Sequence, residues 1–221
     1  MLAMKEVIMS VKGWKLFLGI VSLNLLVIFL SQNILINDIV FFNTYSEQLT
    51  YDRSMELFQL MKSYSWVSYI LVTVFLLLKF TAIAVLLYIG VYFNDIHREL
   101  PLGRIFKMVI ISESIFVTAS IFKLLWFAFF AGNYTLDDIS FFYPLSLINL
   151  FNRSEVATYW VYPLQTVNLF QLMYVLALAF GLSKVGSVKK TLAEKVVLST
   201  YVPAIAVWIS LIMFFTIDAM P

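Results

Sequence analysis

The sequence contains no cysteine and only one histidine, His97. The lack of cysteine excludes disulfides, thiolate catalysis and metal sites built from cysteine ligands. His97 stands between Asp95 and Glu99 in a polar connector, and no other His or Cys exists to converge on a metal with it. We therefore expect a solvated loop histidine. No glycine-rich phosphate loop is present either. The sequence predicts neither enzymatic activity nor a metal or other cofactor.

Charged residues are also scarce, because they make up 13% of the 221 residues against about 25% in soluble domains. Hydrophobic residues make up 62%, and the mean hydropathy is +0.92. Only lipid can surround this much apolar surface without aggregation. A net charge of +2 gives no reason to expect nucleic acid as a partner. The composition predicts one integral membrane domain whose main partner is the lipid bilayer.

Five apolar runs are each long enough to cross a bilayer as a helix. They lie at residues 16–36, 66–93, 108–131, 160–182 and 196–217. Residues 46–63 place apolar side chains at intervals of three or four among charged ones, which predicts a short helix on the membrane surface or packed on the bundle. Thr135 and Asp138 have the spacing of a capping box and predict another short helix, which Pro144 should end or bend. The predicted fold is an all-α membrane protein with five transmembrane helices.

The distribution of lysine and arginine predicts the orientation. Ten basic residues lie in the N-terminal segment and in the connectors 94–107 and 183–195, whereas the other two connectors contain three. Positively charged connectors remain in the cytoplasm. The N-terminus is therefore predicted inside and the C-terminus outside, an arrangement that needs an odd number of spans.

Three ionisable residues fall within the predicted spans: Lys79, Glu113 and Lys123. A charge at membrane depth is costly, so each is a functional candidate. Counted from the predicted cytoplasmic ends, Lys79 lies about 21 Å deep, Lys123 about 23 Å and Glu113 about 8 Å. These depths predict that Glu113 is too far from either lysine for an ion pair. The lysines would extend to the outer interface, or together line one cavity or anion site. Glu113 would be a structural anchor or part of a proton relay.

Three amide residues recur at intervals of three in the fourth predicted span: Gln165, Asn168 and Gln171. This spacing places them on one face of a continuous helix. Such amides commonly form hydrogen bonds to neighbouring transmembrane helices. A polar stripe along a permeation path is the alternative.

Two segments resemble the YIP1 family of small multi-span membrane proteins, particularly its bacterial branch. They are FFYPLSLINLF (Phe141–Phe151) and WVYPLQTVNLFQLMYVLALAFGLSKV (Trp160–Val185). The long outer connection before a proline-containing fourth span and the short basic turn before the last span are similar to the family pattern. The resemblance implies a five-helix fold with a cytoplasmic N-terminus and a location in the bacterial cytoplasmic (inner) membrane.

We therefore expect a non-enzymatic YIP1-like protein, a scaffold or accessory subunit whose partners are other membrane proteins or a second copy of itself. The alternative is a transporter or channel component with a polar intramembrane site at Lys79 and Lys123. The basic cytoplasmic rim leaves a lipid-handling protein as a third hypothesis.

Overall fold

The computed structural model describes residues 10–46 and 48–218, so Lys5, one of the basic N-terminal residues, lies outside the described part. Within these ranges the regular structure is helical, and β-pairing is limited to one isolated bridge between Ser146 and Asn168. Five helices are long and apolar enough to cross a membrane. The predicted all-α membrane architecture is confirmed.

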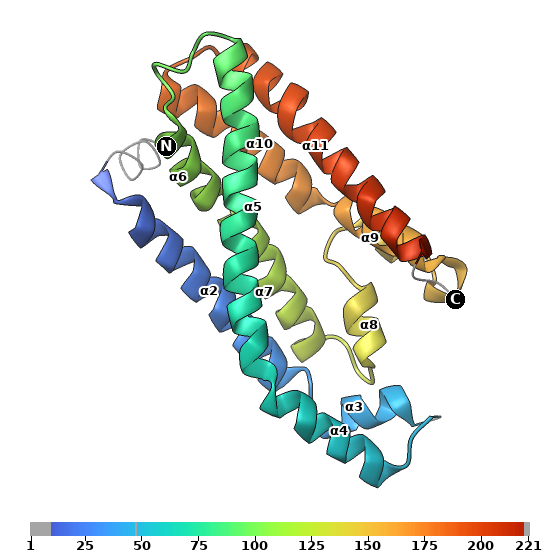
Figure 1. Cartoon of the computed structure of the whole chain (residues 1–221). Helices are drawn as coiled ribbons and strands as arrows, with labels where there is room; N and C mark the ends of the chain where they lie inside the picture. The colour runs from blue at the N-terminus through green and yellow to red at the C-terminus, as the bar shows by residue number, and fades with distance from the viewer. Residues whose placement is uncertain (1–9, 47, 219–221) are drawn as a thin grey trace.

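The spanning helices form one bundle (Figure 1). They are α2 (Gly13–Ile34), α5 (Ser65–Phe93), the pair α6 (Leu102–Ser112) and α7 (Ser114–Phe129), α10 (Leu169–Gly186) and α11 (Lys190–Asp218). Helix α5 packs against α6 and α11, α10 packs against α11 and α6, and α2 packs against α6 and α7. Gly90 lets α5 approach α11 closely, because a Cβ there would be 2.6 Å from Thr200 Cγ2.

The third span begins earlier than predicted, at Leu102 instead of residue 108. Pro101 lies at the position that precedes the helix, and its extended backbone allows α6 to start directly after it. The presence of Arg104 and Lys107 in residues 102–107 predicts a polar connector there, and this prediction is wrong. One face of α6, with Ile105 and Met108, is fully buried in the core. Arg104 and Lys107 are partly exposed in the first turns of this helix.

The fourth span was predicted as one helix over residues 160–182, and the structure divides it. Helix α9 (Thr158–Thr166) ends before Val167, and α10 begins at Leu169. Asn168 adopts an extended backbone conformation, and its side-chain oxygen accepts a hydrogen bond from the backbone N–H of Gln171. An amide that caps a helix in this way competes with continuation of the preceding helix. The predicted start of this span at residue 160 is wrong because the apolar run continues across the break, whereas α10 begins at Leu169.

Shorter helices cover the end of the bundle opposite the basic connectors (Figure 1). They are α3 (Asp38–Tyr45), α4 (Tyr51–Ser63) and α8 (Leu136–Phe141), followed by the 3₁₀ turns η1 (Leu147–Leu150) and η2 (Arg153–Glu155). The capping box of α8 is present, since the Thr135 and Asp138 side chains each accept the other's backbone N–H. Helix α8 ends before Pro144, as predicted. The hydroxyl oxygen of Thr44 in α3 accepts the backbone N–H of Leu136 and thereby joins α3 to α8.

The basic connectors lie together at one end of the bundle. A Cβ added to Gly13, at the start of α2, would be 3.6 Å from Lys107 Cγ. A Cβ on Gly186, at the end of α10, would be 2.6 Å from Leu100 in the connector between α5 and α6. The described N-terminal residues and Asp218, where α11 ends, lie at opposite ends of the bundle (Figure 1). This arrangement agrees with the odd number of spans.

Candidate functional site

An ion pair lies inside the bundle, between α5 and the junction of α6 and α7. The Lys79 Nζ atom donates hydrogen bonds to both carboxylate oxygens of Glu113, at 2.7 and 2.9 Å. The Glu113 side chain is only 3% exposed, and that of Lys79 is 26% exposed. The ammonium also lies 4.4 Å from the centre of the Phe116 ring, on which it can make a cation–π contact.

The prediction that Glu113 is too far from either lysine is therefore wrong. Helix α6 starts at Leu102, which places Glu113 about 17 Å from the start of its span instead of about 8 Å. Lys79 lies about 21 Å from the corresponding end of α5 at Phe93. The flexible lysine side chain spans the remaining difference in depth.

Glu113 is positioned by a one-residue interruption of the third span. It follows the last residue of α6 and precedes the first residue of α7, and its backbone N–H is shared between the carbonyls of Val109 and Ile110 at 3.2 Å each. An irregularity of this kind allows a helix to change direction. Glu113 lies at this junction and is buried against α5, where the carboxylate meets Lys79.

An aromatic cluster from α7, α10 and α11 borders the ion pair. Tyr174 is completely buried, and its ring centre lies 4.8 Å from that of Phe116 and 5.5 Å from that of Tyr201. The Lys79 ammonium lies 6.0 Å from the Tyr174 ring. The Tyr174 hydroxyl has no hydrogen-bond partner among the described residues. The Tyr201 hydroxyl accepts a hydrogen bond from the side chain of Gln171 at 2.9 Å.

The connector between α8 and η1 packs against the break in the fourth span. Burial, and to a lesser extent the negative charge of Glu113, raises the pKa of Tyr143 to about 12. Just after Tyr143 the chain folds back on the break in the fourth span. There the backbone N–H of Leu147 donates to the Val167 carbonyl at 3.0 Å, and that of Leu169 donates to the Leu145 carbonyl at 3.1 Å. These bonds satisfy backbone groups that the break removes from the helix, as membrane depth requires.

The three amides do not lie on one continuous helix face, although the predicted hydrogen bond to a neighbouring spanning helix is present at Gln171. Gln165 lies in α9 and donates to the carbonyls of Ser140 and Phe141 at 2.7 Å each. Asn168 caps α10, and only Gln171 reaches across to another spanning helix, through Tyr201. The prediction of one continuous face is wrong because the helix ends between Gln165 and Asn168. The amides join the outer connector and α11 to the broken fourth span.

Lys123 lies apart from Lys79. It lines a cavity of about 260 Å³ formed by α2, α7 and α8, and Lys79 does not line this cavity. The hypothesis that both lysines line a single cavity is therefore wrong. Lys79 has a carboxylate partner within the bundle, whereas Lys123 makes no ion pair or hydrogen bond with the described residues.

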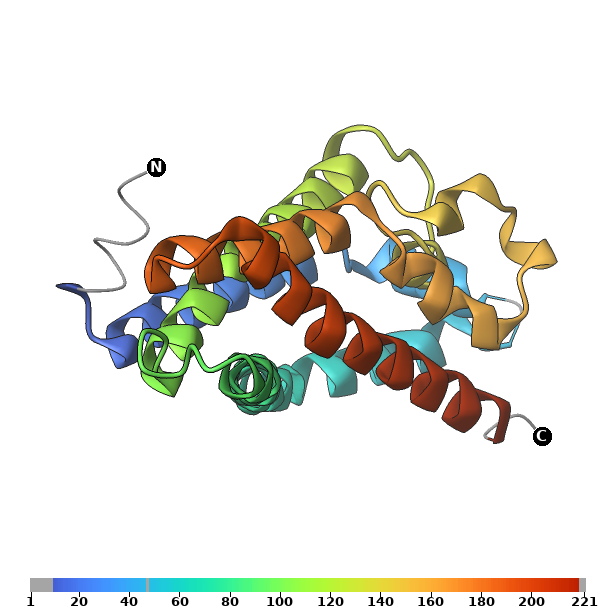
Figure 2. The ribbon, with the colours of Figure 1, turned by 90° about the horizontal axis from the view of Figure 1, so that it is seen from above.

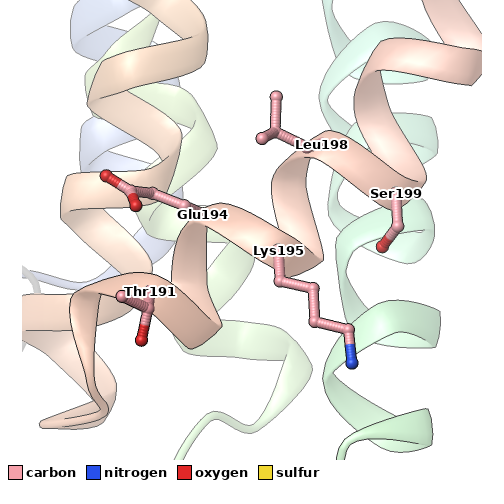
Figure 3. Close-up of a pocket in the computed structure, with 5 residues that line it drawn as sticks. All are labelled: Thr191, Glu194, Lys195, Leu198 and Ser199. Atoms are coloured by element: carbon pink, nitrogen blue, oxygen red, sulfur yellow. The ribbon is translucent and has the colours of Figure 1, made fainter.

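A larger hollow of about 500 Å³ lies on α11, near the end of the bundle where the basic connectors lie (Figure 3). All of its lining residues come from this one helix: Thr191, Glu194, Lys195, Leu198 and Ser199. Glu194 lies 3.5 Å from Lys190, one turn away on the same helix. Because no second element brings polar groups to this hollow, it lacks the convergent arrangement of a ligand site.

Sequence reasoning identified Lys79 and Glu113 but not the tyrosines that surround them. A tyrosine near an apolar run is common at the membrane interface, so its presence in the sequence does not by itself indicate an internal site. Tyr174 and Tyr201 each lie near the middle of a span, and that depth was the available signal. The result is an ion pair that is bordered by aromatic rings and lies near the middle of the spans. It binds α5 to the α6–α7 junction, and it holds the only ion pair between spanning helices in the described part of the chain.

Comparisons with known proteins give no relative. No family model matches the chain, and no curated protein or solved structure matches it. The resemblance to the YIP1 family stays a prediction from the sequence.

Proposed function

We propose that this chain is a non-enzymatic, YIP1-like integral membrane protein of the bacterial cytoplasmic membrane. Its role would be that of a scaffold or accessory subunit in a larger membrane assembly. One observation carries the proposal: five of the six candidate polar residues, all but Lys123, are bonded to other groups of the same chain. Lys79 is bonded to Glu113, Gln171 to Tyr201, and Gln165 to the last two carbonyls of α8. These bonds hold the helices of the bundle to one another.

The surface that remains for a partner is apolar. In the half of α5 that precedes Lys79, large side chains are exposed on one face, among them Leu71, Phe75 and Leu78. Helix α11 contacts α5 through Gly90 and then runs toward α9, where the Trp208 indole donates to the Tyr162 hydroxyl at 2.9 Å (Figure 2). Exposed apolar faces on two diverging helices are suited to lipid and to the helices of another membrane protein.

Site-specific photo-crosslinking in the native membrane tests this proposal. A photoreactive amino acid at Phe75, on the exposed face of α5, should give a discrete adduct with a second protein or a second copy. The same probe at Phe80, which is fully buried, is the matched control and should give none. Exclusively lipid adducts at Phe75, with no partner retained on purification in mild detergent, would contradict the scaffold role.

A transporter or channel component is the second candidate, because the Lys79–Glu113 pair lies at mid-membrane depth beside an unpartnered tyrosine hydroxyl. In this case the site would be the ion pair alone, without Lys123. Flux measured with purified protein in liposomes separates the two candidates. Solute movement that Lys79→Ala abolishes would support transport and overturn the scaffold proposal.

A further inference from the structure

The proposed function assigns no role to the cavity of about 260 Å³ that Lys123 lines. Its lining comes from three helices that are distant in the sequence, α2, α7 and α8. The lining residues are Asn24, Val27, Ile28, Ser31, Gln32, Leu35, Ser120, Lys123 and Ile139. Lys123 is their only charged member. A cation therefore faces a hollow that contains hydroxyl and amide groups but no acid.

The electrostatics of this hollow are unbalanced. Lys79 satisfies its charge within the chain, whereas Lys123 has no protein partner among the described residues. Removing an ammonium from water is costly unless it is paired. Gln32 accepts a hydrogen bond from the Tyr69 hydroxyl through its carbonyl oxygen at 2.8 Å, which leaves its NH₂ group as a donor. The Ser31 hydroxyl at the wall is a second donor, whereas the Ser120 hydroxyl already donates to the Phe116 carbonyl at 3.1 Å. A cation among neutral donors is the arrangement that binds an oxyanion.

The volume of the cavity and its depth in the membrane limit which ligand can bind there. The cavity volume of about 260 Å³ exceeds the volume of about 30 Å³ that one water molecule occupies in the liquid, so a phosphate group fits. Lys123 lies about 9 Å from the outer end of α7 at Phe129. The phosphates of membrane lipids lie in the headgroup region, just beyond that end of the span. Ile139 of α8 borders the hollow on the side of the outer connector.

We propose that the cavity formed by α2, α7 and α8 is an oxyanion site, in which Lys123 binds the phosphate of an anionic phospholipid headgroup. The ammonium supplies the charge, and the Gln32 amide and Ser31 hydroxyl orient the phosphate oxygens. Val27, Ile28 and Leu35 line the same cavity and are suited to contact with the lipid's apolar part. The bound lipid would join α2 to α7 and α8, which also meet through the apolar cluster of Leu35, Leu124 and Phe127.

The test measures phospholipid retained by the purified protein. Full-length protein is extracted with mild detergent from membranes rich in phosphatidylglycerol, and bound lipid per protein is quantified by mass spectrometry. Lys123→Gln should retain at least about tenfold less anionic phospholipid, since a charge-assisted hydrogen bond is lost. Lys184→Gln, at the cytoplasmic end of α10, is the matched control and should retain the wild-type amount. Ser31→Leu keeps the charge but fills the cavity, and it should also lower retention.

A second arm distinguishes lipid phosphate from free phosphate. Delipidated protein is heated in sodium phosphate and in sodium chloride of equal ionic strength. If retained lipid does not depend on Lys123, but phosphate raises the melting temperature of the wild type and not of Lys123→Gln, the site binds free phosphate. The oxyanion assignment would then hold without the lipid.

If neither lipid retention nor the effect of phosphate differs between wild type and Lys123→Gln, the proposal is overturned. Lys123 would then only extend its ammonium toward the outer interface. Should Lys123→Gln not fold, Ser31→Leu, in which the ammonium is unchanged, gives the same comparison. These outcomes do not depend on whether the chain is a scaffold, because crosslinks at Phe75 are measured separately.

Discussion

Removal of either member of the Lys79–Glu113 pair should have unequal consequences, and the exposed fractions of the two side chains give the reason. Lys79→Met leaves Glu113 as an unpaired carboxylate whose side chain is 3% exposed, with no other cation bonded to it. Breaking a buried pair from one side typically costs about 3–5 kcal/mol. Glu113→Gln leaves an ammonium that is 26% exposed, already rests on the Phe116 ring and can move toward a more polar depth. We expect a loss roughly half as large for Glu113→Gln.

The double variant Lys79→Met/Glu113→Leu tests whether the two effects are coupled. With both charges removed and apolar side chains of similar volume in place, no buried charge is left unpaired. Replacing a buried ion pair in this way is often neutral or stabilising. The double variant should therefore be more stable than Lys79→Met alone, with a coupling free energy of about 1–3 kcal/mol.

The assay is unfolding of the purified protein in mixed micelles, followed by tryptophan fluorescence as the denaturing detergent is increased. Thr81→Ala, two residues beyond Lys79 on α5, is the matched control, since the Thr81 hydroxyl bonds only to the Leu77 carbonyl of its own helix. It should change stability by less than about 0.5 kcal/mol. Additive losses in the double variant, or equal losses in the two single variants, would refute this reasoning.

The remaining predictions concern helix contacts. Gly90→Ala and Gly186→Ala should each destabilise the fold by about 1–3 kcal/mol, because the added methyl groups would lie 2.6 Å from Thr200 and Leu100. Gly19→Ala, where nothing lies within 4 Å, should leave the unfolding midpoint unchanged or slightly raised, and an equal loss there would contradict the packing described. Asn168→Ala should cost about 0.5–2 kcal/mol in the same assay, because α10 loses its N-cap. Asn168→Asp retains the capping oxygen and should lose less; a larger loss for Asp would argue against a capping role.

Composition and the run lengths of apolar residues were sufficient to predict the helical membrane fold. Each spanning helix must satisfy its own backbone hydrogen bonds in lipid, so an apolar run of about 20 residues has few structural options. The capping box at Thr135 was equally readable, because both partners lie within one turn. The predicted ends of two spans were wrong. Pro101 starts α6 inside a connector that carries basic residues, and Asn168 interrupts an apolar run without any proline at the break.

The sequence predicted the charged residues of the candidate site but not which of them are in contact. The cost of an intramembrane charge identified Lys79, Glu113 and Lys123 individually. Their partners depend on helix starts, on the interruption at Glu113 and on which helices are neighbours, and none of these has a periodic signature in the sequence. A six-residue error in the start of α6 shifted Glu113 by about 9 Å in depth and led to the wrong conclusion about its pairing. Tyr174 was missed because its role depends wholly on tertiary packing.

Accessibility of introduced cysteines tests the central claim most directly, and the natural absence of cysteine makes the labelling specific. Single cysteines replace Ser10, Ser187 and Asp218, all of which are exposed. In intact cells, a reagent that does not cross the membrane should label position 218 alone, and positions 10 and 187 should react only after the membrane is made permeable. Labelling of positions 10 and 218 from the same side would contradict a bundle that crosses the bilayer five times.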